Sequence, residues 1–215
     1  MLRRPFVLAC AGTACSGIAS ARPCAGPDLG RLSGLPLGGA LREFRDLAAA
    51  AAGLPLTERL VFVNTAINRR VDYASDAEQF GADVWLTPLE TLALGRGDCE
   101  DMAIAKFFVL LAADTPADSL RLLYAIRRSP QTPGCAEPHL LALARQPFVD
   151  PLALDVINLN PLLVPLSWRD DLEPVLSFDC HRLWAGVQGT VRDDAAARLH
   201  RWRDLLQRID AQRAG

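Results

Sequence analysis

Several patterns that mark common functional classes are missing from this 215-residue chain. No basic stripe or polybasic run accompanies its net charge of −2, so nothing indicates binding to nucleic acid or to an anionic membrane. A phosphate-binding loop and a dinucleotide fingerprint are both absent. The zinc-ligand spacings Cys-x-x-Cys and His-x-x-x-His do not occur, and no internal repeat is visible. Any chemistry must therefore come from residues that folding brings together.

Histidine is scarce, which narrows the choice of a catalytic base. The chain has only His139, His181 and His200. His200 falls within a C-terminal helical pattern, and His181 lies beside Cys180 near an expected surface turn. His139 begins an apolar, strand-like run, in which the direction of a side chain is fixed. His139 is therefore the candidate catalytic histidine.

The first residues have the layout of a secretory signal peptide. Arg3-Arg4 precede an apolar stretch from Phe6 to about Ala14, and Ala19-Ser20-Ala21 offers a small-x-small cleavage site. A short buried helix is the alternative, but the early glycines and the Ala-Ser-Ala exit favour export. No other segment approaches the ~20 apolar residues that a membrane span needs.

The remaining sequence predicts a single domain. We expect a signal peptide over residues 1–21, a flexible Gly- and Pro-rich leader over 22–39, and one domain over 40–215. Half of the residues are hydrophobic, which is enough for one core and too few for two large domains.

Cysteine usage allows few disulfides. Cleavage after Ala21 leaves Cys24, Cys99, Cys135 and Cys180. If Cys99 is catalytic, the other three form at most one disulfide, which an oxidising compartment permits. The sequence does not choose the pair, and buried free thiols are the alternative.

Hydrophobic periodicity predicts helices in the first half and strands in the second. Helices are expected over residues 40–52, 56–71, 89–94, 99–113 and 192–212, with Thr87, Pro88 and Glu90 forming a helix-start pattern. Strands are expected over 120–127, 139–144, 152–157 and 174–178, with irregular segments over 73–88 and 128–138. The 99–113 helix is too apolar for the surface. The sequence thus predicts an α+β fold, in which N-terminal helices and a buried central helix pack on an antiparallel sheet.

The segment Gly97-Asp98-Cys99-Glu100-Asp101 is the most informative, because it places a cysteine where a turn becomes a helix. A thiol attacks as the thiolate, and the unpaired amides and dipole of a helix N-terminus lower its pKa. A nearby histidine would pair with the thiolate and protonate the leaving group. Cys99, His139 and Asp155 follow the order of a papain-like or transglutaminase-like triad.

Asp155 would be the third member of that triad. It lies in an apolar run, where a buried carboxylate needs a partner. Orienting His139 through its second ring nitrogen would supply one. Each residue also has a plainer interpretation, since a cysteine in an apolar helix is usually a core residue. The Gly-Asp-Cys turn and the order of the three residues weaken that alternative.

The acids around Cys99 oppose formation of a thiolate. Asp98, Glu100 and Asp101 either cap the helix N-terminus and face solvent, or bind a hard cation such as Ca²⁺ that cancels their charge. From the chemistry alone capping is favoured, because acids are ordinary in a first helical turn.

Taken together, several segments resemble the bacterial transglutaminase-like cysteine proteinases of the LapG type. The likeness covers roughly residues 55 to 180. It is carried by Trp85-Leu86-Thr87-Pro88-Leu89-Glu90-Thr91-Leu92, Gly97-Asp98-Cys99-Glu100-Asp101, Ala103-Ile104-Ala105-Lys106, Leu120-Arg121-Leu122-Leu123-Tyr124, His139, Leu154-Asp155 and Asp171-Leu172-Glu173-Pro174-Val175-Leu176-Ser177-Phe178.

The resemblance implies a papain-like, transglutaminase-type fold and a periplasmic enzyme. Cys99 would be the nucleophile, His139 the general base and acid, and Asp155 the orienting carboxylate. Family members bind calcium through acids beside the nucleophile, which carries over to Asp98 and Glu100, with Asp101 as a further ligand.

The resemblance also implies a substrate and a regulator. Enzymes of this type cleave a large surface adhesin near its N-terminus, at an Ala-Ala-Gly type site, and so disperse biofilm. The periplasmic domain of an inner-membrane cyclic di-GMP receptor sequesters them. The chain departs from the family where Leu140-Leu141 follow His139 and Val156 follows Asp155. These departures leave the triad intact and bear on substrate fit.

Two questions of mechanism remain open in the sequence. The backbone N–H of Cys99 is the natural first oxyanion donor, and the indole of Trp85 is either a second donor or a core aromatic. The same triad serves an endopeptidase and a transglutaminase-type acyl transferase. A catalytically silent binding module is the third alternative, which the intact triad disfavours.

Overall fold

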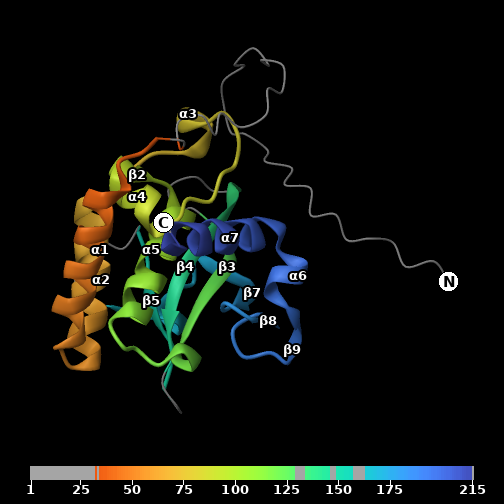
Figure 1. Ribbon diagram of the computed structural model, residues 1–215. Coiled ribbons are helices and arrows are strands. Elements are labelled where there is room, and N and C mark those ends of the chain that lie inside the picture. Colours follow the sequence, from red (N-terminus) through yellow and green to blue (C-terminus); the bar gives the residue numbers. More distant parts are fainter. Residues whose placement is uncertain (1–31, 33, 129–133, 146–148, 157–162, 215) are drawn as a thin grey trace.

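The computed structural model describes residues 32, 34–128, 134–145, 149–156 and 163–214. Four helices, α1 (Leu37–Ala52), α2 (Leu56–Arg70), α4 (Pro88–Leu94) and α5 (Cys99–Ala112), gather on one side of a large sheet (Figure 1). The C-terminal helix α7 (His200–Ala214) crosses the end of the same layer. The α+β prediction with an antiparallel sheet is therefore confirmed.

The large sheet has the strand order β6-β5-β4-β3-β7-β8-β9, and every described pairing in it is antiparallel. Its strands are β3 (Leu120–Arg128), β4 (Ala136–Ala144), β5 (Leu152–Leu154), β6 (Val164–Pro165), β7 (Leu172–Phe178), β8 (Arg182–Ala185) and β9 (Val191–Asp194). The remaining short elements are β1 (Asp72–Tyr73), α3 (Asp76–Gln79), β2 (Arg96–Gly97), α6 (Ala195–Arg198) and the 3-10 turns Ala117–Ser119 and Leu166–Trp168.

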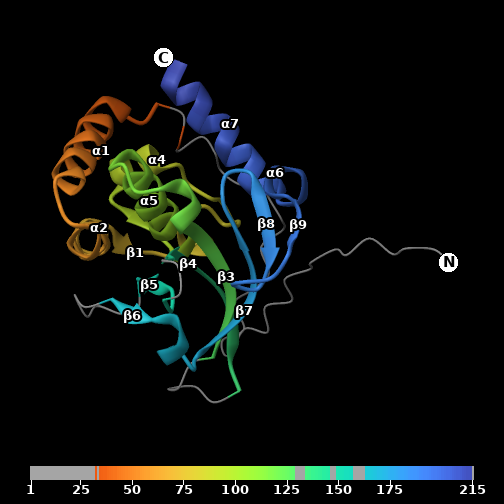
Figure 2. The ribbon, with the colours of Figure 1, turned by 90° about the horizontal axis from the view of Figure 1, so that it is seen from below.

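Helix α5 is the centre of the fold, as its composition predicts. All but three of its fourteen residues are buried, and the helix contacts α1, α2, α4, β3 and β4. Figure 2 shows it between the outer helices and the sheet. A smaller apolar cluster, which includes Leu123, Leu141 and Leu143, covers the other face of the sheet. The central position of α5 makes its first residue, Cys99, a fixed point in the fold.

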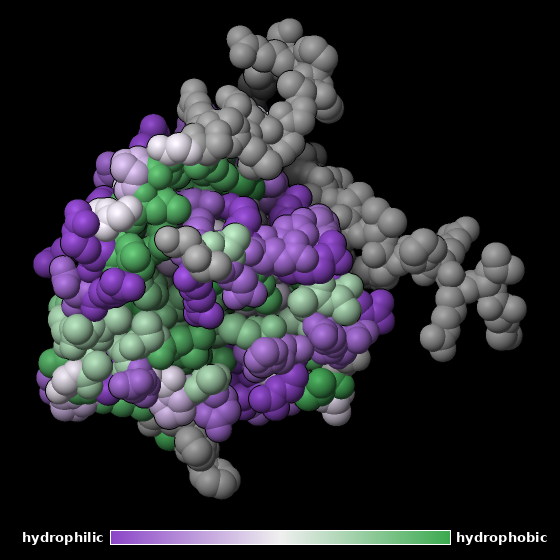
Figure 3. Space-filling model, viewed as in Figure 1, coloured by the Kyte–Doolittle hydropathy of each residue, from purple (hydrophilic) through white to green (hydrophobic). Residues whose placement is uncertain are grey.

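Helix α7 docks on the domain through Trp202. This side chain has 0% exposure and packs against the rings of Phe107, Phe108 and Phe178. Its indole donates to the carbonyl oxygen of Asp179 at 3.1 Å. The outer surface around α6 and α7 is mostly hydrophilic, whereas apolar surface gathers over the N-terminal helices (Figure 3). The amphipathic pattern thus marks a helix that packs on its own domain.

Several expected boundaries are wrong because short elements carry little periodicity. The segment 73–88 is not wholly irregular, since β1 ends in it and α3 lies within it. The 192–212 stretch begins as β9 and α6, and the long helix starts only at His200. Strands β6 and β8, of two and four residues, had no sequence signal.

The two strands that carry the candidate triad also differ from their expected bounds. β4 starts at Ala136 rather than His139, although Pro138 lies in it. Because β5 pairs only with the last three residues of β4, Pro138 has one strand neighbour, and its missing N–H is tolerated there. β5 ends at Leu154, so Asp155 follows the strand instead of lying inside it.

Cys135 is disulfide-bonded, whereas Cys99 and Cys180 are free thiols. Cys135 and Cys180 are therefore not partners in this structure. The signal peptide expected over 1–21 lies outside the described residues. Within the described ranges, no helix is both long and apolar enough to cross a membrane.

Candidate active site

The turn before α5 is shaped by hydrogen bonds between two aspartates. Asp98 is the N-cap residue, and its Oδ1 accepts from the backbone N–H groups of Glu100 and Asp101. Oδ2 of Asp101 in turn accepts a hydrogen bond from the backbone N–H of Asp98 at 3.2 Å. A Cβ on Gly97 would lie 2.8 Å from both Cβ and Oδ2 of Asp101, so this close approach requires glycine. The sequence thus fixes where the helix begins.

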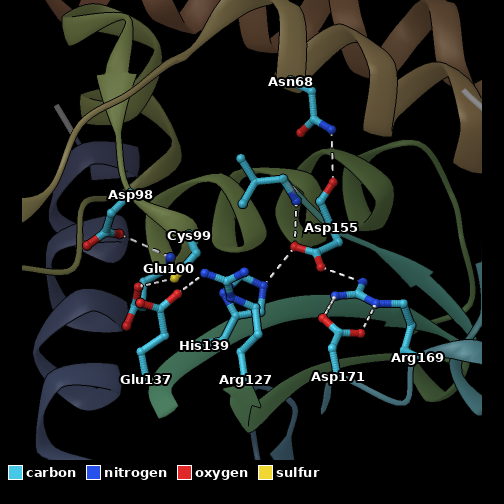
Figure 4. A network of polar contacts seen from close by, with 11 residues as sticks. Asn68, Asp98, Cys99, Glu100, Arg127, Glu137, His139, Asp155, Arg169 and Asp171 are labelled. Carbon is cyan, nitrogen blue, oxygen red and sulfur yellow. Dashed lines mark hydrogen bonds and ion pairs between the residues drawn. The ribbon is translucent and has the colours of Figure 1, made fainter. Parts of the chain in front are cut away.

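Cys99 is the first residue of α5 and has 7% exposure. Its Sγ lies 2.7 Å from Oε2 of Glu100. The backbone N–H of Leu140 also donates to the sulfur, which places the thiol against the strand that carries His139. In Figure 4, His139 lies between Cys99 and Asp155. The structure therefore brings the three candidate triad residues together.

His139 is buried and forms a hydrogen bond with Asp155. Its Nε2 lies 2.8 Å from Oδ1 of Asp155, and the exposures are 2% and 1%. Nδ1 is left as the ring nitrogen available to Cys99. Because a carboxylate accepts, this pairing selects the tautomer in which Nε2 carries the proton. The expectation that Asp155 has a histidine partner is met.

The sequence reasoning missed Arg169, which also binds Asp155. Arg169 donates from Nη1 to Oδ2 of Asp155, and from Nε and Nη2 to Asp171 at 2.7 and 2.8 Å (Figure 4). Burial alone would raise the pKa of Asp155. The hydrogen bond and charge of His139, with Arg169, outweigh burial and hold that pKa well below its usual range. Asp155 is thus a fixed negative charge behind the imidazole.

The backbone of Asp155 is anchored as well as its side chain. Its Oδ1 accepts from the N–H of Val156 at 2.7 Å, and its carbonyl oxygen accepts from Nδ2 of Asn68 at 2.9 Å. Asn68 belongs to α2, so the helical layer also positions the carboxylate. No pattern in the sequence marks Asn68 or Arg169, because both reach Asp155 only through the tertiary fold.

Three aspartates form a group that is capable of holding a cation. Asp76, Asp98 and Asp101 each offer an oxygen within 4.8 Å of the others. Oδ1 of Asp76 is buried and has no hydrogen-bond partner in the structure. Asp101 has 0% exposure, and its Oδ1 accepts from the N–H of Leu86 at 2.8 Å. An unpaired buried oxygen among three acids fits a hard cation, for which carboxylate oxygens are the preferred ligands.

This group differs from the set expected from the sequence. Asp76, on the short helix α3, joins Asp98 and Asp101, while Glu100 contacts the sulfur of Cys99. The capping interpretation is right for Asp98 and Asp101, but the prediction that these acids face solvent is wrong for Asp101. Capping uses some carboxylate oxygens, so it does not exclude a cation. Glu100 remains a predicted ligand that rests on the resemblance.

The acids also act on the nucleophile. Burial, Glu100 and Asp98 together raise the pKa of Cys99 well above its usual value. Burial and the charge of Glu100 raise the pKa of Asp98 from 3.8 to about 8, and burial and Asp98 raise that of Asp76 to about 7. Without a cation, burial and the negative charges therefore outweigh the effect of the helix N-terminus on the thiol pKa.

These raised values predict how the stability of calcium-free protein depends on pH. The pKa of an unfolded aspartate is 3.8, whereas in the folded protein it is about 7 for Asp76 and about 8 for Asp98. At a pH between these values, both carboxyls hold more protons in the folded state than in the unfolded state. The free energy of unfolding should therefore fall as pH rises through this window. Urea denaturation in EGTA should show a more stable protein at pH 5 than at pH 8. Asp76→Asn should reduce this difference in stability between pH 5 and pH 8. A wild-type protein that is more stable at pH 8 would contradict the raised pKa values of Asp76 and Asp98.

Trp85 is a core aromatic in the structure. It has 9% exposure and stacks on Phe178 with ring centroids 6.2 Å apart. Its carbonyl oxygen accepts from Arg208 of α7, which also pairs with Glu90. The segment before α5 is thus held by the C-terminal helix.

Comparison with known proteins gives the class of this site. Residues 46–141 match the family described as bacterial transglutaminase-like cysteine proteinase BTLCP. The matched region includes Cys99 and His139 and ends before Asp155. With the structural likeness that follows, this match identifies the protein as a cysteine peptidase.

Solved structures of LapG from Legionella pneumophila are similar to this chain. The EGTA-treated protein is 29% identical, with a TM-score of 0.68 over 84% of this chain and 94% of that one. A second LapG structure is 28% identical, with a TM-score of 0.66 over 84% and 93%. The calcium-bound protein is 28% identical, with a TM-score of 0.65 over 84% and 95%. Among curated proteins, no match was found.

Proposed function

We propose that the protein is a calcium-dependent periplasmic endopeptidase that cleaves a large surface adhesin near its N-terminus, at an Ala-Ala-Gly type site. Cleavage would release the adhesin and promote biofilm dispersal. The observation that carries the peptidase chemistry is the placement of Cys99 at the start of α5, beside the 2.8 Å His139–Asp155 pair. The adhesin substrate is proposed from the resemblance to LapG-type proteinases. The periplasmic location is proposed from that resemblance and from the signal-peptide pattern.

In this mechanism each triad residue has one task. The Cys99 thiolate attacks the scissile carbonyl, and the backbone N–H of Cys99 is the first oxyanion donor. His139 carries the thiol proton on Nδ1 and delivers it to the leaving amine. A water molecule deprotonated by His139 then hydrolyses the thioester. Asp155 keeps the Nε2–H of His139 directed away from the sulfur.

Calcium would be held by Asp76, Asp98 and Asp101, with Glu100 as the further ligand that the resemblance implies. A bound ion would cancel negative charge beside the nucleophile. This accounts for a catalytic cysteine whose surroundings raise its pKa when no cation is present. The likeness to LapG structures in calcium-bound and EGTA-treated forms supports the choice of calcium.

Calcium removal tests this assignment. The substrate is an N-terminal adhesin fragment with an Ala-Ala-Gly site, and cleavage is followed by mass spectrometry. EGTA should lower the rate about 10-fold to 10²-fold, and added calcium should restore it. Asp76→Asn should raise the calcium concentration needed for half-maximal activity. Glu78→Gln is the matched control, because Glu78 is exposed on the same short helix. Full activity in EGTA would rule out calcium dependence.

The same substrate separates peptidase from acyl-transferase activity. If water resolves the thioester, both cleavage fragments appear and a labelled primary amine is not incorporated. Incorporation that competes with cleavage would favour the transglutaminase-type alternative. Neither product, with a folded protein, would favour the binding module.

We also propose that the periplasmic domain of an inner-membrane cyclic di-GMP receptor sequesters the enzyme. This proposal rests on the resemblance alone. Adding the purified receptor domain should inhibit cleavage of the adhesin fragment in a saturable manner. Unchanged cleavage at saturating receptor, with no complex on gel filtration, would count against it.

A further inference from the structure

Lys106 is a buried cation that the proposed mechanism does not use. It is the only lysine in the chain, whose other basic side chains are arginines. Its side chain has 0% exposure, and its Nζ has no hydrogen-bond partner in the structure. Burial lowers the pKa of this amine to about 7. An unpaired buried amine costs stability, so its presence calls for a role other than stabilising the core.

The helical position of Lys106 directs it toward the triad. It follows Cys99 by seven residues, which is nearly two full turns, so both lie on one face of α5. Side chains in a helix lean back toward its N-terminus, and the long lysine stem therefore runs toward the nucleophile end. Helix α5 contacts β4, the strand that carries His139. The negative charges that act on the amine are those of Asp155 and then Cys99.

Asp155 lies in a group of charged side chains of both signs. Arg169 pairs with both Asp155 and Asp171, so two carboxylates share one guanidinium. The side chain of Asp155 has 0% exposure, and a buried charge needs compensation. His139 contributes a positive charge only while it is protonated. When it is protonated, Lys106 adds a further positive charge that acts on Asp155.

We propose that Lys106 is a positioning residue for the His139–Asp155 pair: its buried amine, when protonated, acts on the Asp155 carboxylate through its charge and without a hydrogen bond, and so stabilises the arrangement that directs the imidazole. The inference deepens the proposed function and rests on it for the roles of His139 and Asp155. The electrostatic coupling between Lys106 and Asp155 is measurable without peptidase activity.

The first test removes the charge of Lys106 and keeps an unbranched side chain of similar length. Lys106→Met should lower kcat by about 10-fold to 10²-fold with little change in KM, because the imidazole is less well directed. The downfield proton signal of the His139–Asp155 hydrogen bond should shift or broaden. The thermal midpoint should not fall, because an unpaired amine has been removed. A merely structural lysine would give a lower midpoint with an unchanged proton signal, which would overturn the proposal.

Leu110→Met is the matched control for this variant. Leu110 lies one turn further along α5 and has 0% exposure. The control changes packing without changing charge, so it should leave kcat and the proton signal as in wild type. Equal effects of the two substitutions would also overturn the proposal.

The second test leaves Lys106 in place. With ¹³C-labelled lysine the chain gives a single Cε signal, whose titration reports the Lys106 amine. Cys99, the other titratable group that acts on this amine, is replaced by alanine throughout. Asp155→Asn should lower the amine pKa by about one unit, since a nearby negative charge is lost. Asp171→Asn should have a smaller effect.

An amine that titrates identically with Asp155 and with asparagine would refute the coupling, whatever the activity of the enzyme. Coupling in a protein that cleaves no peptide would instead count against the proposed function. The two failures are thus distinguishable.

Discussion

Cys99→Ala is expected to abolish peptide cleavage while leaving the fold intact. The substitution removes the attacking atom, and losing the nucleophile of a triad costs ~10⁶-fold in kcat in a serine peptidase with the same logic. Alanine is compatible with the first turn of α5, because the N-cap contacts are made by Asp98 and Asp101. Cleavage of the adhesin fragment should therefore disappear, with an unchanged circular dichroism spectrum.

Cys180→Ala is the matched control for this experiment. Cys180 is the other free thiol among the described residues, and it is half-buried. It should keep the wild-type rate. Residual cleavage by the Cys99 variant, at more than a trace of the wild-type rate, would show that another group is the nucleophile.

Asp155→Asn is expected to lower kcat by ~10³-fold to 10⁴-fold. Asparagine has one acceptor oxygen and one NH₂ group, so it cannot accept from both His139 and Arg169 as the carboxylate does. In serine peptidases the corresponding change costs ~10⁴-fold, because the wrong imidazole tautomer is stabilised. KM should change little, since Asp155 is buried behind the histidine.

The same variant should be less stable than wild type, because Arg169 loses a buried partner. Removing one member of a buried ion pair costs about 3–5 kcal/mol, which urea denaturation detects. Asp171→Asn is the control, since Asp171 also pairs with Arg169 but is partly exposed. It should reduce both kcat and stability by much less. Equal kcat losses in the two variants would mean that Arg169, rather than Asp155, orients His139.

The sequence predicted the parts of the fold that depend on local chemistry. The helix-start pattern at Thr87 gives a capping box with Glu90 in the structure, and α5 begins at Cys99 after its Asp98 cap. Strands β3 and β7 were found because they run for nine and seven residues, long enough for periodicity to show.

The parts that the sequence did not predict depend on contacts between distant segments. Asp76 lies 22 positions before Asp98, on a four-residue helix within a segment expected to be a loop. Arg169, which follows the 3-10 turn before β7, reaches Asp155, and nothing local indicates that contact. The apolar composition of α5 does not indicate that the amine of Lys106 is fully buried without a hydrogen-bond partner, which only the packed structure shows.

The burial of α5 has a consequence for control of the enzyme. Eleven of its fourteen residues are buried, so we expect the amide hydrogens in the core of α5 to be among the slowest of the domain to exchange. A movement of α5 that withdrew Cys99 from its histidine would therefore disturb the core. We therefore expect control of this enzyme to act on what surrounds the nucleophile: the charge of the neighbouring acids, or the access of the peptide to Cys99.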